Sequence, residues 1–460
     1  MKTELSPDIL QCAIAYYHKL LDDPELSVES REMLDRGLSS SKLIFGDRRL
    51  TPYLRPHFIT QEDWERVAAV GETIFGALQK VKDAAVMDDA VLDELGITEI
   101  ERELVKIDPG YSQVSPTSRL DSFLTSDSYS YVELNGESPA GIAYADSATE
   151  IFQSLPIVKK FAERFELRGF EGRSKMLEVL LSSYDEFRSG ASLDRKPSVA
   201  IVDLAGLPTQ AEFELFEEYF EYRGHNTVIA TPQELEYDGK RLVFRGLEID
   251  IVYKRLLVNE YLPIMEEYPA LLEAYRAGSV CLVNSFQSKL VHKKAIFAVL
   301  TNERYKHLFD TAEQIAIHAH VPWTRRFREE QTEYKTERIH LVEWTRSQKE
   351  KLVLKPNDDY GGHGIYIGWN STETEWDDAI GVALADGDYL VQERVKTAKE
   401  EFPMLFGFEG EIQMVEQLVD LDPLLFNGVP GSAFTRLSST ELANVTAGGG
   451  MVPTFIISEK

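Results

Sequence analysis

Short apolar runs of strand-like composition alternate with longer segments of helical spacing, and this alternation limits the fold more than any other feature of the sequence. Residues 198–204 and 226–230 have the residue types of buried strands, and a stretch with helical spacing lies between them at 210–222. From about residue 285 onward, helix-like and strand-like segments alternate again, and the last part is mostly strand-like. We therefore expect an α/β protein.

Changes in this pattern divide the chain into four regions. The first is expected to be mostly helical, because apolar residues recur at helical spacing over 9–21 and 64–86. The second contains one strand-like piece, and two helices are expected after it, over 147–168 and 173–188. The third is the strand–helix–strand segment, which should form a small α/β unit, and the fourth holds the remaining elements. The regions are 1–108, 109–195, 196–284 and 285–460.

The chain carries a large negative charge. Its 77 acidic and 49 basic residues give a formal net charge of −28. A surface of this sign repels nucleic-acid backbones and acidic membrane surfaces, so we expect neither as a binding partner. Any anionic ligand therefore needs a local group of cations that acts against the field of the whole molecule.

The cysteine content and the N-terminal segment indicate the cytoplasm. Two cysteines, Cys12 and Cys281, cannot make a disulfide framework for a chain of 460 residues. The N-terminal segment lacks the basic start and the apolar run of a signal peptide. No run approaches the roughly 18 apolar residues of a membrane span. We expect a cytoplasmic protein with reduced thiols.

Two short polar motifs in the second region have the chemistry of a metal site. Arg119 and Asp121 are two residues apart, so an extended chain points both side chains to one face. Glu133 and Asn135 have the same spacing on the strand-like piece 129–134. If the two segments pair, three oxygen ligands converge beside a guanidinium, which suits Mg²⁺ with phosphate or water as its other ligands. The alternative is a turn and an edge strand with solvated polar side chains.

A lysine at the end of an apolar strand precedes a glycine-rich segment. Lys355 ends the run that begins at Leu352, and Gly361, Gly362 and Gly364 follow before the next strand. Glycines let backbone N–H groups approach phosphate oxygens closely, and the lysine adds a positive charge. The segment is no Walker loop, since G-x-x-x-x-G-K-[ST] occurs nowhere in the chain. The pattern favours phosphate binding over an ordinary hairpin with a flexible turn.

Two weaker motifs suit other parts of a nucleotide. Lys294 follows another lysine in a segment expected to be helical over 285–300. Gln392 and Glu393 lie inside an apolar strand, where backbone groups can meet an adenine and a carboxylate can meet a ribose. A solvated basic pair and an ordinary edge strand are the alternatives.

A third weak motif lies near the end of the chain. Arg436 lies on an expected strand, and Asn444 with a run of three glycines follows it. An arginine, an amide and glycines together suit phosphate and metal. A surface strand with a flexible turn is the alternative.

Taken in order, these motifs resemble those of the circularly permuted ATP-grasp ligases. The resemblance is to the synthetase domain of glutathionylspermidine synthase and, more distantly, to eukaryotic-type glutathione synthetase. In that family an R-x-D segment precedes an E-x-N strand, and an N-K-A-[IL] lysine, a V-K-P strand with a glycine-rich loop, an adenine strand and a late arginine follow. The resemblance covers roughly residues 110–460, and the matched residues are Arg119, Asp121, Glu133, Asn135, Lys294, Lys355, Gly361, Gly362, Gly364, Gln392, Glu393 and Arg436.

The resemblance implies a fold and a reaction. The expected fold is a circularly permuted ATP-grasp core with an N-terminal helical region and a small inserted α/β unit that contacts substrate. The implied activity is that of an ATP-dependent carboxylate–amine ligase. In such ligases ATP phosphorylates a small-molecule carboxylate, an amine attacks the acyl phosphate, and an amide, ADP and phosphate result. The implied cofactors are ATP and Mg²⁺.

The resemblance also implies a role for each matched residue. Mg²⁺ would be bound by Asp121, Glu133 and Asn135. Arg119 and Arg436 would be catalytic, because they would stabilise the transferring group and the acyl phosphate. The residues implied to bind the nucleotide are Lys294, Lys355, Gly361, Gly362, Gly364, Gln392 and Glu393.

Two features depart from the family pattern. Asp358 and Asp359 place negative charge at the mouth of the glycine-rich loop. That charge is unfavourable beside a triphosphate unless the carboxylates point away or meet a metal ion. We expect no counterpart of the amidase unit of the two-domain relatives, so no hydrolytic activity is implied.

Two other kinds of protein fit the same motifs. One is a non-catalytic nucleotide-binding or scaffold protein that retains the fold, which would bind ATP without producing ADP. The other is a phosphotransferase that stops after phosphorylating its acceptor, which would give a product in the absence of any amine. The intact set of acidic and basic motif residues argues against the scaffold.

Overall fold

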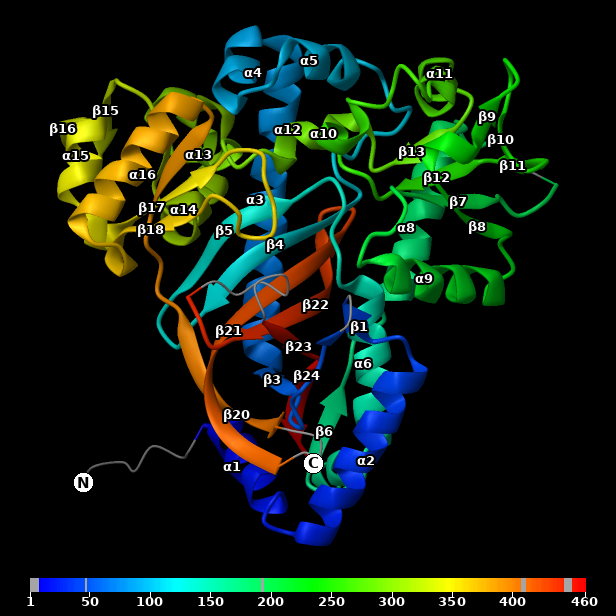
Figure 1. Ribbon diagram of the computed structural model, residues 1–460, viewed down its shortest axis with the longest axis vertical. Helices are drawn as coiled ribbons and strands as arrows, with labels where there is room; N and C mark the ends of the chain where they lie inside the picture. The colour runs from blue at the N-terminus through cyan, green and yellow to red at the C-terminus, as the bar shows by residue number, and fades with distance from the viewer. Residues whose placement is uncertain (1–7, 46–47, 192–193, 407–410, 442–448) are drawn as a thin grey trace.

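A long antiparallel sheet lies at the centre of the computed structural model, which describes residues 8–45, 48–191, 194–406, 411–441 and 449–460 (Figure 1). The strands run in the order β23-β22-β21-β4-β5, and β20 pairs with the first half of β21. Helix α3 (Gln61–Met87) lies behind the sheet in Figure 1 and packs on β21 and β22. The strands are β4 (Thr117–Leu124), β5 (Tyr129–Asn135), β20 (Ala398–Phe406), β21 (Glu411–Phe426), β22 (Val429–Ser438) and β23 (Gly450–Val452).

The pairing of β4 with β5 sets the register of the polar motifs. Arg119 lies opposite Asn135, and Asp121 lies opposite Glu133. A tight turn joins the strands, in which Thr125 N–H donates to the Ser128 carbonyl at 2.8 Å. The two motif segments therefore pair.

A second sheet forms the upper left lobe in Figure 1, with the antiparallel order β14-β19-β17-β18. The glycine-rich segment connects β17 to β18, and this connection reaches toward the middle of the molecule (Figure 1). The elements of this lobe are β14 (Thr324–Arg326), β15 (Gln331–Tyr334), β16 (Glu337–His340), α15 (Leu341–Ser347), β17 (Leu352–Pro356), β18 (Tyr366–Ile367), η5 (Gly368–Asn370), α16 (Glu373–Asp386) and β19 (Tyr389–Glu393).

A parallel sheet forms the upper right lobe, with the order β13-β12-β7-β8. The chain runs from β7 to β8 on one side and later returns to β12 on the other side. The carboxyl ends of β7 and β12 therefore meet at a switch point, where sheets of this kind bind ligands. The elements here are α8 (Gly172–Phe187), β7 (Val199–Val202), α9 (Gln210–Tyr222), β8 (Thr227–Ala230), β9 (Leu235–Tyr237), β10 (Leu242–Phe244), β11 (Leu247–Ile249), β12 (Ile251–Lys254), α10 (Val258–Tyr261), α11 (Ala270–Arg276) and β13 (Cys281–Val283).

Both ends of the described chain contribute to the lower part of the molecule. A three-stranded sheet has the order β3-β24-β6, so a C-terminal strand lies between two strands from the first 170 residues. Helices α1, α2, α6 and α7 pack around it (Figure 1). The elements are α1 (Ile9–Leu20), α2 (Pro24–Ser40), β1 (Ile44–Phe45), β2 (Arg48–Arg49), β3 (His57–Thr60), α6 (Ile142–Ser154), α7 (Pro156–Phe161), β6 (Phe165–Arg168) and β24 (Thr454–Glu459).

Short helices cover the top of the molecule in Figure 1 and continue into the upper left lobe. Those at the top are α4 (Asp89–Leu95), α5 (Glu99–Val105), η2 (Phe286–Ser288) and α12 (Lys289–His292), whereas α13 (Ile296–Leu300) and α14 (Thr311–His320) lie in the upper left lobe. Helices α4, α12, α13 and α14 contact α3, and α5 contacts η2 and α12.

The helical expectations for 9–21, 64–86 and 210–222 are confirmed by α1, α3 and α9, but the single helix expected over 147–168 is wrong. Helix α6 ends at Ser154, because Leu155 precedes a proline and takes an extended backbone. Residues 165–168 form β6, which pairs with β24. That strand depends on a partner almost 300 residues away, which local spacing does not reveal.

The helix expected over 285–300 is also wrong. The segment is divided into η2, α12 and α13, and Lys293 has an extended backbone at the break. None of the helices in the described part of the chain has the length and apolar character that crossing a membrane requires.

Candidate functional site

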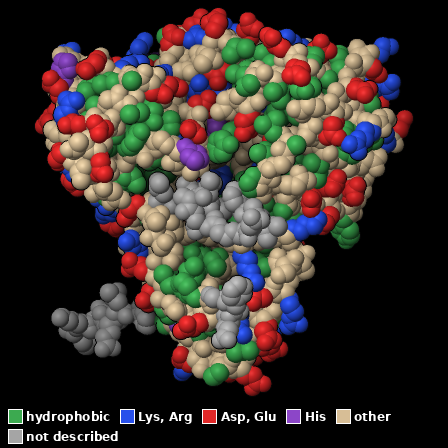
Figure 2. Space-filling model, viewed as in Figure 1, with side chains coloured by type: hydrophobic (Ala, Val, Ile, Leu, Met, Phe, Trp, Pro, Cys, Tyr) green, Lys and Arg blue, Asp and Glu red, His purple; other side chains and the backbone are tan. Residues whose placement is uncertain are grey.

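One pocket of about 600 Å³ lies where the central sheet meets the two upper lobes. Figure 2 shows the surface hollowed between these lobes, with acidic side chains scattered over both. The volume is within the usual range of ligand sites. Every predicted site residue except Gly364 lines this pocket, namely Arg119, Asp121, Glu133, Asn135, Lys294, Lys355, Gly361, Gly362, Gln392, Glu393 and Arg436.

The floor of the pocket is the face of the central sheet that carries the first polar motif. The Arg119 guanidinium donates to both oxygens of Asp121, at 2.8 and 3.2 Å. The amide nitrogen of Asn135 donates a hydrogen bond to the Asp121 carboxylate at 2.8 Å, and Arg436 Nη2 donates another at 2.6 Å. Four donors thus meet one buried carboxylate. Burial alone would raise the pKa of Asp121, but the two guanidiniums outweigh it and hold the pKa below its usual range.

Two acidic residues on the floor were missed by the sequence analysis. Asp420 and Asp422 lie on β21, and both form ion pairs with Arg436, at 3.0 Å for Asp422. Their carboxylates and that of Asp121 offer oxygen atoms that lie within 4.8 Å of one another. Burial raises the pKa of Asp422 well above its usual value and raises that of Asp420 as well. The signal was present: two aspartates alternate with apolar residues inside a long buried strand.

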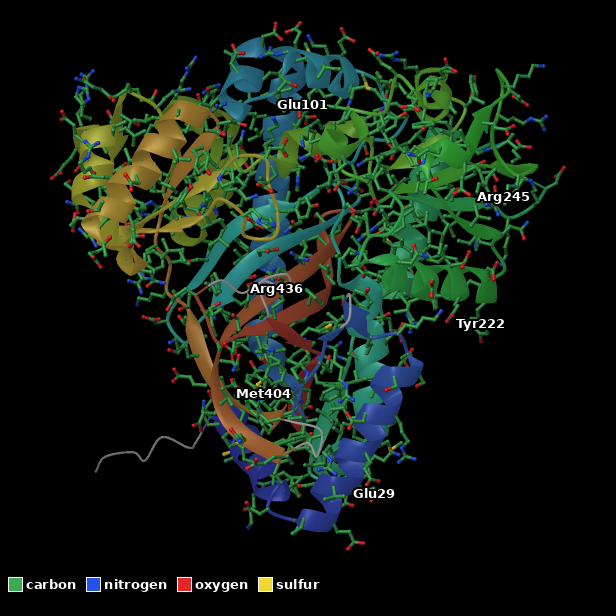
Figure 3. All side chains as sticks on the ribbon, viewed as in Figure 1. Glu29, Glu101, Tyr222, Arg245, Met404 and Arg436 are labelled. Atoms are coloured by element: carbon green, nitrogen blue, oxygen red, sulfur yellow. The ribbon has the colours of Figure 1, made fainter. Side chains whose placement is uncertain are left out.

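One nitrogen of the Arg436 guanidinium has no hydrogen-bond partner among the described residues. Its Nη2 contacts all three carboxylates of the floor, whereas its buried Nε has no hydrogen-bond partner there. The residue is only 8% exposed, and it lines the pocket. Figure 3 shows it on the central sheet, below the two upper lobes.

The facing wall carries two lysines. Lys355, on β17, donates to the Val132 carbonyl at 2.8 Å. Lys294 donates to the Asp359 carbonyl at 2.6 Å and lies 3.5 Å from the Glu133 carboxylate. Burial lowers the pKa of Lys355 to about 8, against the opposing effect of Glu133.

The break in the expected helix explains the position of Lys294. Asn357, just before the glycine-rich loop, accepts a hydrogen bond from Lys294 N–H at 3.0 Å through its carbonyl. Its side-chain oxygen accepts another from Ala295 N–H at 2.8 Å. These bonds satisfy backbone groups that a continuous helix would use, so Lys294 lies against the loop rather than on a helix face.

Three glycines of the loop have a backbone conformation that other residues rarely adopt. Gly361, Gly362 and Gly364 have φ values of 71°, 80° and 67°, a region that side chains disfavour. A Cβ atom on Gly364 would lie 2.7 Å from the Tyr389 hydroxyl, so this glycine packs under the loop instead of lining the pocket. The two acidic residues before the loop diverge, since Asp359 lines the pocket and Asp358 contacts Lys289 at 2.6 Å.

The predicted adenine strand is β19, which lies at the left end of the pocket, formed by the upper left lobe. Gln392 donates to Thr324 Oγ1 at 3.0 Å and to the Val132 carbonyl at 3.4 Å. Glu393 accepts a hydrogen bond from the Tyr334 hydroxyl at 2.6 Å, from the β15–β16 hairpin. Both side chains therefore have partners that hold them at the pocket edge.

The right wall of the pocket is the side formed by the parallel sheet of the upper right lobe. The sequence analysis named no residue of this wall. Asp203 follows β7 and Arg255 follows β12, at the switch point of this sheet. Arg255 is buried and bonds to Glu212 at 3.3 Å and to the Pro139 carbonyl at 2.6 Å. Burial raises the pKa of Asp203 to about 6. Asn444, from the last weak motif, lies outside the described residues.

Comparison with known proteins shows the fold. No protein-family model and no curated protein matches the sequence. A glutathione synthetase-like effector from Globodera pallida is similar in structure, with a TM-score of 0.59 and 15% identity over 94% of this chain and 98% of that one. A putative gamma-glutamylcysteine synthetase from Methylobacillus flagellatus has a TM-score of 0.36 and 9% identity, over 85% of this chain and 86% of that one.

A RimK-domain ATP-grasp protein from Sphaerobacter thermophilus has a TM-score of 0.27 and 15% identity, over 56% of this chain and 89% of that one. The fold assignment rests on the effector, which is similar over nearly the whole of both chains. The expected α/β class is confirmed, and the chain shares its fold with this glutathione synthetase-like effector. Circular permutation of the fold stays a prediction.

Proposed function

We propose that the chain is an ATP-dependent ligase that joins a carboxylate to an amine through an acyl phosphate. The observation that carries the proposal is the meeting of opposite charges in one pocket. Lys294 and Lys355 approach from the upper left lobe and the segment beside it, and Glu133 lies opposite them on the floor. Phosphoryl transfer from Mg-ATP needs this combination of cations and oxygen ligands around one triphosphate.

The floor residues suit Mg²⁺. Glu133 has an ion pair with Lys294 at 3.5 Å, and Asn135 binds Asp121 through its nitrogen, which leaves its amide oxygen for another ligand. Carboxylate and amide oxygens are the hard ligands that Mg²⁺ prefers, and the ion would neutralise phosphate charge. Asp121 remains the third proposed ligand, although four donors now occupy its oxygens and one of them would have to move.

The basic residues would bind the phosphates and the acyl phosphate. Lys294 and Lys355 lie on the wall that faces the floor, where they would contact the α- and β-phosphates. The buried Nε of Arg436 has no partner among the described residues, so it could donate to an oxygen of the transferring group. Arg119, held by Asp121 and the Ala140 carbonyl, would act beside it.

The two ends of the pocket would bind different molecules. At the left end, Gln392 and Glu393 would bind the adenine and the ribose, and Gly361 and Gly362 would cover the phosphates. The carboxylate and amine substrates would lie toward the right wall, where the switch point of the parallel sheet opens into the pocket. Loop closure would exclude water from the acyl phosphate, which hydrolysis would otherwise destroy. The order of the motifs also supports circular permutation and a likeness to the glutathionylspermidine synthase synthetase domain.

An isotope experiment tests the reaction. A set of carboxylates labelled with ¹⁸O and a set of amines are incubated with the protein and Mg-ATP, and the product phosphate is examined by mass spectrometry. A ligase of this type moves one ¹⁸O atom from the carboxylate into phosphate, and ADP release requires both substrates. ATP binding without ADP on any pair would instead favour the scaffold alternative. A phosphorylated product formed without amine would favour the phosphotransferase.

A further inference from the structure

Six ionisable side chains form a buried cluster behind the pocket wall, which we call the buried lysine cluster. Its three cations and three anions come from the β12 strand, α12 and its end, α5, the turn after β5, and the start of the glycine-rich loop. The members are Lys254, Lys289, Lys293, Glu101, Glu137 and Asp358. Figure 3 shows Glu101 at the top of the molecule, on α5.

Lys289 is the centre of this cluster. Its ammonium lies 2.6 Å from Asp358, 3.1 Å from Glu137 and 3.8 Å from Glu101, and the residue is 0% exposed. A buried ammonium is tolerated only where carboxylates compensate it, and a carboxylate that loses its partner is equally costly. Lys289 and Asp358 therefore hold each other in place.

This pairing removes one of the two negative charges that the sequence places at the mouth of the glycine-rich loop. Asp358 and Asp359 are adjacent in the sequence, yet Asp359 lines the pocket and Asp358 does not. The Asp358 carboxylate faces Lys289 and lies 3.7 Å from Lys293, on the side away from the pocket. Its negative charge is thus both compensated and turned away from the place proposed for the triphosphate.

We propose that Lys289 is a positioning residue for the nucleotide. Its ion pair with Asp358 keeps that carboxylate out of the pocket. Because Lys289 also pairs with Glu137, it holds the start of the glycine-rich loop against the turn that follows β5. The inference rests on the proposed function, because it assumes that a triphosphate occupies the pocket. It concerns a residue that does not line the pocket and that acts through Asp358.

The test compares Lys289→Met with the double variant Lys289→Met/Asp358→Asn. Calorimetry measures the dissociation constant for Mg-ATP. The single variant should bind about tenfold more weakly, which is the size expected for one uncompensated charge near an anion in a partly buried site. The double variant should recover to within about threefold of the wild type, because the uncompensated charge is gone. If the double variant binds as weakly as the single one, the proposal is wrong.

Lys254→Met is the matched control. Lys254 is also 0% exposed and belongs to the same cluster, but its partners are Glu137 at 3.7 Å and the Leu256 carbonyl, not Asp358. It should lower the melting temperature and leave Mg-ATP affinity unchanged. Equal weakening in Lys254→Met and Lys289→Met would reduce the cluster to a structural role. If Lys289→Met does not fold, Lys289→Gln takes its place in both comparisons.

Chymotrypsin cleavage after Tyr360 separates this inference from the proposed function. Tyr360 lies in the loop and is 52% exposed, so cleavage reports how firmly the loop is held. Without nucleotide, Lys289→Met should be cleaved several times faster than the wild type, and Lys254→Met at the wild-type rate. If the wild type does not bind Mg-ATP, the proposed function fails, and this rate alone decides whether Lys289 positions the loop. Equal rates in all three proteins would overturn it.

Discussion

Asp121 organises the floor of the pocket, because each of its two oxygens accepts two hydrogen bonds. Its partners are Arg119, Asn135 and Arg436, which come from three different strands. A carboxylate has about four lone-pair positions, so this one is saturated. Glu133, opposite it on β5, has instead a single lysine at 3.5 Å and faces the pocket. The two neighbouring acids therefore differ in what they can still bind.

Glu133→Ala should abolish Mg-ATP turnover while the fold remains intact. The variant removes the carboxylate that we assign to Mg²⁺, and loss of one such group should lower the rate by about a hundredfold or more. ADP release measures the effect, and an unchanged melting temperature shows that the protein is folded. Full activity in this variant would rule out the metal assignment.

Glu137 should make stability depend on acid pH. Burial alone would raise the pKa of Glu137, but Lys289 and Lys254 lower it to about 2 from an ordinary value of 4.5. The ionised form is therefore favoured in the folded protein, and its contribution, about 3 kcal/mol, is present above pH 4.5 and is lost as the pH falls toward 2.

Urea unfolding at several pH values between about 3 and 6 measures this dependence. The free energy of unfolding should fall more steeply in the wild type than in Glu137→Gln, which carries no titrating group at this position. Parallel curves would contradict the prediction.

At the scale of elements, strands from distant parts of the chain close the lower sheet. Strand β24 pairs in parallel with β3 and antiparallel with β6. Phe455 and Ile457, on β24, are 0% and 2% exposed, so the strand joins the N-terminal helices to the rest of the core. The first region of the sequence is thus part of the same body as the floor of the pocket.

Phe455→Ala should destabilise the protein by about 3–5 kcal/mol, because it leaves a cavity under the middle strand of this sheet. Ser458→Ala, on the exposed end of the same strand, is the control and should change stability by less than about 0.5 kcal/mol. Thermal and urea unfolding measure both. Similar midpoints for the two variants would show that β24 contributes little to the core.

In the whole molecule, the pocket lies where the central sheet meets the two upper lobes. The central sheet supplies the floor, the left lobe supplies Lys355 and the glycine-rich loop, and the right lobe supplies Asp203 and Arg255. The net charge of −28 opposes an anionic ligand, so the local cations must outweigh it. Arg119 and Arg436 are already compensated by acids, which makes Lys294 and Lys355 the main attraction for phosphate.

Mg-ATP should therefore raise the melting temperature, and Lys355→Ala should remove the effect. A ligand that binds only the folded protein stabilises it by about 2.7 kcal/mol at roughly a hundredfold excess over its dissociation constant. Differential scanning fluorimetry with Mg-ATP, ATP alone and Mg²⁺ alone separates the contributions. An equal shift in the variant would place the nucleotide away from Lys355.

Residue spacing was sufficient to predict much of the local geometry. Residues two apart on an extended strand share a face, so spacing alone predicts that Arg119 lies beside Asp121 and Glu133 beside Asn135. Helical spacing of apolar residues likewise predicts helix α9 over 210–222. The α/β class followed from the alternation of elements.

Which charges compensate one another depends on contacts between segments that are distant in the sequence. Asp121 and Arg436 are 315 residues apart in the sequence, and Asp420 and Asp422 join them because β21 pairs with β4 and β22. Asp358 turns from the pocket because a buried lysine on a distant helix compensates it. Local spacing says which face of an element a side chain occupies. The burial and partners that set its charge and pKa come from chain segments brought together by folding.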